Sequence, residues 1–146
     1  MALNYPVQQI ITLIGSKSGT TRTSVTLTDA YGVANKTTIF PTGGMTKVNF
    51  SILYTMGATE TTNSVELRLE SSSDGTNFYR IPNEAVSAGT STLTLREFTW
   101  VGVNAAASSI SLPLDLQDKY MRISVKETGV VTNFGTIYVE AIISGK

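Results

Sequence analysis

The residue types that carry most protein chemistry are scarce or absent in this sequence. Its 146 residues include no histidine and no cysteine, so zinc, copper and iron lack their usual nitrogen and sulfur ligands. A calcium site would have to be built from oxygen ligands in and before one turn: Glu70, Asp74, Thr76 and Asn77. Calcium prefers several converging carboxylates, whereas Asp and Asn at this spacing are typical of an Asx turn. We therefore expect a turn here, and no metal or other cofactor.

Acid-base and nucleophilic catalysis are the other chemistries to consider. A carboxylate pair for glycoside hydrolysis would be drawn from scattered acidic residues: Glu60, Glu66, Glu70, Asp115 and Asp118. Glu66 and Glu70 alternate with apolar neighbours, which is typical of solvent-exposed positions on a strand. A serine nucleophile needs a base, and the sequence has neither a histidine nor a Ser-x-x-Lys motif. We expect the protein not to be an enzyme.

Aromatic side chains offer one possible binding chemistry, because exposed rings form the platforms that bind sugars. Trp100 lies two residues after Phe98 in a strand-like stretch. If Trp100 points outward, it would form such a platform with Tyr5, Tyr31 or Tyr138. Large aromatic residues are usually well buried, so the competing interpretation places Phe98 and Trp100 in the core or in a subunit interface.

The elements that position these residues are strands, because apolar and polar residues alternate with a period of two. The alternation is strict from Val48 to Met56. We expect strands near residues 8–14, 21–28, 36–40, 46–56, 64–70, 77–81, 91–101, 119–127 and 135–143, with a weaker one near 108–112. Turn residues separate these stretches, and no stretch of helical length carries an apolar stripe. The prediction is an all-β fold: an antiparallel β-sandwich, jelly-roll-like, with little or no helix.

The clearest predicted hairpin joins residues 64–70 to 77–81 through Asp74-Gly75, a strong hairpin signal. In its first strand we expect alternate residues to be buried and exposed: Val65, Leu67 and Leu69 in the core, with Glu66, Arg68 and Glu70 in water. The last two strands repeat the pattern, with these residues inward: Met121, Ile123, Val125, Ile137, Val139, Ala141 and Ile143.

Length and charge narrow the class of protein. The chain fits one domain, residues 10–146, preceded by a flexible N-terminal arm, residues 1–9. Its formal net charge is zero, from 11 basic and 11 acidic residues, and it has no basic cluster of the kind that binds nucleic acid. We expect no membrane span and no signal peptide. Charged residues make up only 15% of the chain, which suits a surface packed against other proteins.

Two stretches carry a family resemblance. The segment 67–79, LRLESSSDGTNFY, resembles a hairpin common in β-sandwich modules of tailed-bacteriophage virion proteins. Residues 120–125 and 135–141 are similar to the last two strands of those modules. The resemblance implies a structural virion protein, most often a head decoration (cement) protein and otherwise a neck, tail or fibre component. It implies synthesis in the host cytoplasm, location in the virion, and the major capsid protein or another virion protein as partner.

Two further expectations concern assembly. Low charge favours a homo-oligomer, and the resemblance suggests a trimer. The candidate partner-binding residues lie in the arm, where an extended stretch can add a strand to a neighbouring sheet: Tyr5, Pro6, Val7, Gln8 and Gln9. The competing interpretation of the arm is a frayed terminus. The competing function is a carbohydrate-binding or adhesion module.

Overall fold

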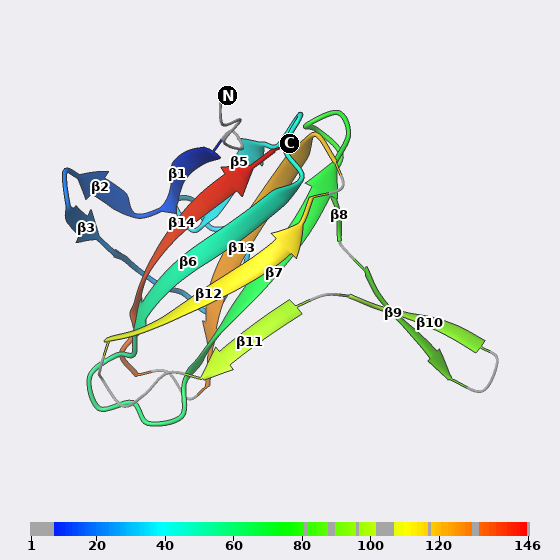
Figure 1. The fold of residues 1–146 in the computed structure, drawn as a ribbon. Helices are drawn as coiled ribbons and strands as arrows, with labels where there is room; N and C mark the ends of the chain where they lie inside the picture. Colours follow the sequence, from blue (N-terminus) through cyan, green and yellow to red (C-terminus); the bar gives the residue numbers. More distant parts are fainter. Residues whose placement is uncertain are drawn as a thin grey trace.

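The chain folds into an antiparallel β-sandwich (Figure 1). The computed structural model describes residues 8–80, 82–87, 90–95, 97–101, 107–116, 118–129 and 132–145. Over 82–101, and at positions 107, 108, 110 and 112, it describes the backbone alone. All regular elements in these ranges are strands: β1 (Gln8–Ile14), β2 (Ser16–Ser18), β3 (Thr21–Thr23), β4 (Val25–Thr26), β5 (Thr37–Pro41), β6 (Lys47–Thr55), β7 (Ser64–Ser72), β8 (Tyr79–Arg80), β9 (Pro82–Ser87), β10 (Thr90–Leu95), β11 (Glu97–Val101), β12 (Ala107–Asp115), β13 (Tyr120–Thr128) and β14 (Thr136–Ser144).

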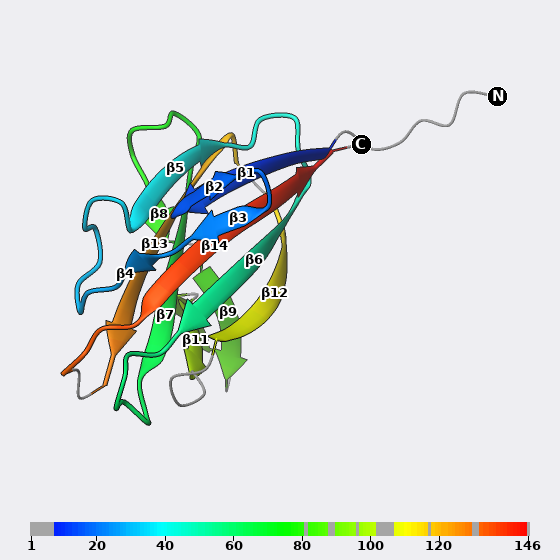
Figure 2. The ribbon, with the colours of Figure 1, turned by 90° about the vertical axis from the view of Figure 1, so that its left-hand side faces the viewer.

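Two sheets make up the sandwich, as the alternating pattern predicts. The first has the order β1-β14-β6-β12, with β4 also paired to β14. The second has the order β11-β7-β13-β5, with β8 also paired to β7. Figure 2 shows the first sheet in front of the second. Two short hairpins, β2–β3 and β9–β10, are separate from both sheets, and in Figure 1 the β9–β10 hairpin stands away from the sandwich.

The long strands pair in a nested order. β7 pairs with β11, β6 with β12, β5 with β13 and β1 with β14, all antiparallel. Along the chain, the two strands of each pair therefore flank the pair named before it, so the four pairs are nested. The chain crosses from one sheet to the other between β4 and β5, β5 and β6, β6 and β7, β11 and β12, β12 and β13, and β13 and β14. The last two strands, which look alike in sequence, therefore lie on opposite sides of the core.

The core lies between the sheets and contains the residues that the alternation places inward. All of the expected core positions of the last two strands are at most 1% exposed. Phe40 of β5 and Phe50 of β6 meet edge to face across the core, with ring centroids 6.1 Å apart, a favourable aromatic geometry. Burying each large apolar side chain of this kind stabilises the fold by roughly 1.5–3 kcal/mol relative to leaving it in water.

The structure differs from the expected strands in three places. The stretch 21–28 divides into β3 and β4, because residues 16–23 form a hairpin of their own. The stretch 91–101 divides into β10 and β11, and β9 lies where no strand was predicted. The weak strand near 108–112 is the longer β12, Ala107–Asp115, paired with β6 along its whole length. Ile110, Leu112 and Leu114 of β12 do alternate with polar residues, but Pro113, a residue disfavoured inside strands, interrupts the signal.

Candidate interaction surface

Two of the acidic residues considered for catalysis hold other parts of the fold in place. The Glu70 carboxylate accepts two hydrogen bonds from the Arg122 guanidinium, at 2.6 and 2.8 Å, which joins β7 to β13. The Glu60 carboxylate accepts hydrogen bonds from the backbone N–H groups of Thr132 and Asn133, at 2.7 and 3.0 Å. Both carboxylates therefore have structural partners that explain their positions.

The polar face of β7 is not open to water as the sequence suggested. Glu70 is only 8% exposed, and Glu66 and Arg68 are half-buried. The segment between β4 and β5 lies over Glu66 and Arg68: the Arg68 guanidinium carbon is 3.9 Å from the ring centroid of Tyr31, and the Tyr31 hydroxyl donates to Glu66 at 3.2 Å. Burial, with the nearby Glu66 carboxylate, raises the pKa of Tyr31 to about 12. The expectation of exposure was wrong because it treated the strand without the segment that covers it.

A buried carboxylate that the sequence analysis passed over links the two sheets. Glu127 is 0% exposed and accepts hydrogen bonds from the Tyr54 hydroxyl at 2.5 Å, the Asn63 amide at 3.2 Å and the Gly135 N–H at 2.7 Å. Burial raises the pKa of the Tyr54 hydroxyl above its usual value, and the bond to Glu127 adds to this rise. The alternation contained the signal, since Glu127 follows Val125 by two residues and so faces inward.

The turn around Asp74 is an Asx turn, as predicted. The Asp74 carboxylate accepts hydrogen bonds from the backbone N–H groups of Asn77 and Thr76, both at 2.8 Å, and from the Asn77 side-chain amide and the Ser72 hydroxyl. The backbone N–H of Asn77, followed by that of Thr76, holds the pKa of this carboxyl well below its usual range. Among the described residues, no group of three acidic side chains lies close enough to hold a metal ion.

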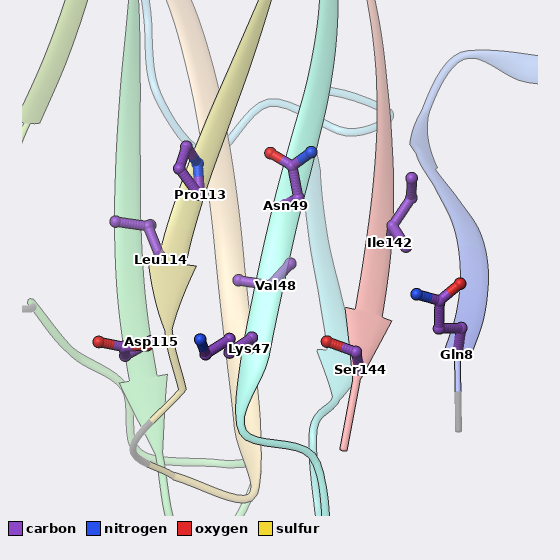
Figure 3. A pocket seen from close by; sticks show the side chains of 9 residues that line it. All are labelled: Gln8, Lys47, Val48, Asn49, Pro113, Leu114, Asp115, Ile142 and Ser144. Carbon is purple, nitrogen blue, oxygen red and sulfur yellow. The ribbon is translucent and has the colours of Figure 1, made fainter. Parts of the chain in front are cut away.

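The outer face of the first sheet carries an open groove of about 540 Å³ at one end (Figure 3). Strand pairing arranges its side chains in two rows across the sheet. The outer row is Asp115, Lys47, Ser144 and Gln8, and the inner row is Pro113, Asn49 and Ile142. Val48 and Leu114 also line the groove.

The groove combines a neutral rim with apolar side chains. Lys47 and Asp115 lie directly opposite each other in the pairing of β6 with β12, so their charges balance. Ile10 pairs with Ile142 on the neighbouring strand and is 61% exposed. The other candidate acid, Asp118, lies outside the groove and is half-buried, and its backbone carbonyl accepts a hydrogen bond from the Thr42 hydroxyl at 2.5 Å. The groove therefore offers contact area and hydrogen-bonding groups.

The other end of the same face is covered by the β2–β3 hairpin. Lys17 and Arg22 of the hairpin lie 3.3 and 3.6 Å from the Glu140 carboxylate. The Tyr138 hydroxyl donates to that carboxylate at 2.8 Å, and this bond, followed by Lys17, lowers the pKa of Glu140. Gly15 leads into the hairpin with φ +90°. The hairpin thus covers Tyr138 and Glu140 of β14, while Ser109 and Ser111 of β12 on the same sheet stay exposed.

Of the predicted partner-binding residues, Gln8 lines the groove. Gln8 and Gln9 belong to β1, where they pair with Ser144 and Ile143 of the same chain. Tyr5, Pro6 and Val7 lie outside the described residues. Their role in binding a partner stays a prediction.

The aromatic residues considered for a sugar-binding platform lie in different parts of the fold. Trp100 is in β11, opposite Val65 of β7, and its side chain lies outside the described part. Tyr138 is 1% exposed, and the face of Tyr31 is covered by Arg68. Among the residues whose side chains are described, Tyr79 on the short strand β8 is a large aromatic residue that is exposed, at 70%.

Comparison with models of known protein families and with curated protein sequences gives no match for this chain. In the part of the chain that the structure covers, no helix is long and apolar enough to cross a membrane.

Proposed function

We propose that this protein is a non-enzymatic structural component of a virion, a capsid decoration protein that binds the outer surface of the shell and associates with copies of itself. The observation that carries the proposal is the open, neutral groove on the outer face of the sandwich. The candidate carboxylates Glu60, Glu66 and Glu70 are engaged in contacts that stabilise the fold. A shell protein needs contact surfaces and a stable scaffold, and these are the features that the described residues supply.

The strand order supports this proposal at the level of fold. Winding one long hairpin around a core gives nested pairs, which is how a jelly roll of two interleaved Greek keys is built. The pairs β1–β14, β5–β13, β6–β12 and β7–β11 fit that description. Jelly rolls are frequent among viral capsid domains, although a fold on its own does not define a function. The virion-like hairpin and closing strands of the sequence add to this support.

The proposed partners are the major capsid protein and further copies of this chain. A decoration protein sits on a regular shell, so a closed symmetric assembly, with a trimer as the first expectation, matches the local symmetry axes of its partner. The low charge of the chain leaves little repulsion between copies. In this proposal the protein is made in the host cytoplasm and joins the particle there.

Binding to particles tests the proposal. Purified protein is mixed with shells of the virus whose genome encodes it and then sedimented through a density gradient. We expect the protein to travel with the shells in a fixed ratio and to raise the temperature at which they disrupt. If it stays in the unbound fraction while a glycan panel gives saturable binding, the carbohydrate-binding alternative replaces the proposal.

A further inference from the structure

We propose that the groove at the end of the first sheet receives residues 1–7 of a second copy of this chain. The inference rests on the self-association part of the proposed function and names the two surfaces that meet. The groove's volume of about 540 Å³ is within the range of roughly 300–1,000 Å³ that is typical of binding clefts.

The groove and the segment have matching chemistry. Residues 1–7 read Met-Ala-Leu-Asn-Tyr-Pro-Val and carry no charged side chain. Pro113 and Ile142 offer apolar contacts for such a segment, and Asn49 and Ser144 offer hydrogen-bonding groups for its backbone. Lys47 and Asp115 lie opposite each other, so the rim is neutral overall. A segment without charged side chains can therefore cover this floor without adding a charge to it.

The direction of the chain favours a second copy over the chain's own groove. Gln8, the first residue of β1, lies in the outer row of the groove. The same row contains the last residue of β14, the first of β6 and the last of β12. For the residues before Gln8 to enter their own groove, the chain would have to reverse its direction directly before β1. Seven extended residues span at most about 25 Å, enough to reach an adjacent molecule.

The same geometry favours binding on the face of the sheet over addition to its edge. β12 is the edge strand beside the groove, and its Pro113 has no N–H to donate to an added strand. The segment of one copy in the groove of the next is a head-to-tail contact, which closes into a ring when the rotation between copies allows it. A trimer is one such ring.

Disulfide crosslinking tests this inference directly, because the chain has no cysteine of its own. The variants Tyr5→Cys and Asp115→Cys are purified separately, one with a size tag, then mixed and oxidised. The control mixture combines Tyr5→Cys with Thr132→Cys, an exposed position before the start of β14 and therefore at the far end of that strand from the groove. We expect the mixed dimer of Tyr5→Cys with Asp115→Cys to form at least tenfold faster than the control dimer.

Other results would overturn the inference. Equal rates in the two mixtures would mean random collision. If the double variant carrying both cysteines crosslinks only within one chain, the segment occupies its own groove. The outcome is independent of shells: crosslinking without shell binding contradicts the proposed function alone, and shell binding without crosslinking contradicts this inference alone.

Discussion

The hydroxyl of Tyr54 on β6 donates a 2.5 Å hydrogen bond to the fully buried carboxylate of Glu127 on β13. Tyr54 belongs to the first sheet and Glu127 to the second, so this bond links the two sheets through the core. Glu127 also accepts the N–H of Gly135 and thereby fixes the connection from β13 to β14. A buried carboxylate is stable only while its hydrogen bonds are made.

Removing the Tyr54 hydroxyl leaves Glu127 short of one donor in the core. We expect Tyr54→Phe to lower the free energy of unfolding by about 1–3 kcal/mol, measured by urea denaturation. Tyr79→Phe is the matched control, because Tyr79 is 70% exposed, and we expect a change within about 0.5 kcal/mol. Equal effects of the two substitutions would contradict a structural role for the buried bond.

Gly15 is required where the chain leaves β1 for the β2–β3 hairpin. Its φ is +90°, and an added Cβ would lie 2.4 Å from the Thr23 carbonyl oxygen. We expect Gly15→Ala to destabilise the protein by about 1–3 kcal/mol, with a lower thermal midpoint. Gly19→Ala is the control, since Gly19 also has a positive φ but nothing lies within 4 Å of its Cβ position. If both variants lose the same stability, the close approach at Gly15 contributes nothing.

The depressed pKa of Glu140 predicts a pH dependence. A carboxyl whose pKa is lower in the folded state binds fewer protons there than in the unfolded state, so stability rises with pH through that range. The contribution of Glu140 to stability is complete at pH values above its unfolded-state pKa, near 4.5. It is lost as pH falls through its lower folded-state pKa. We expect the wild type to lose its stability advantage over Glu140→Gln as pH falls below about 4.5, measured by thermal unfolding. A difference that stays constant from pH 7 to pH 3 would contradict this.

Deleting residues 2–7 removes the proposed contact between copies and keeps β1 intact, since that strand starts at Gln8. We expect light scattering to show a closed oligomer for the full chain and a monomer for the deletion. Circular dichroism should show the same strand content for both. If the deletion keeps the oligomer, self-association uses another surface.

Sequence reasoning predicted the class of fold because the alternation of strands such as β6 reports directly which side is buried. It predicted the Asx turn because Asp74 and Asn77 bond within their own turn. It failed where a distant segment decides the environment: the burial of Glu70 depends on the elements around it, and the length of β12 depends on pairing with β6. The groove could not be predicted from the sequence for the same reason. Its lining residues come together only through strand register: Gln8, Asn49, Pro113 and Ser144.

The central claim is that this protein stabilises a capsid by binding its outer surface. A density map of particles purified with the protein, together with a map of particles lacking it, tests the claim most directly. We expect ordered copies of the sandwich on the capsid exterior, absent from the second map, with the outer face of the β1-β14-β6-β12 sheet buried against a neighbouring molecule. Identical maps, with no protein detected in the purified particles, would contradict it.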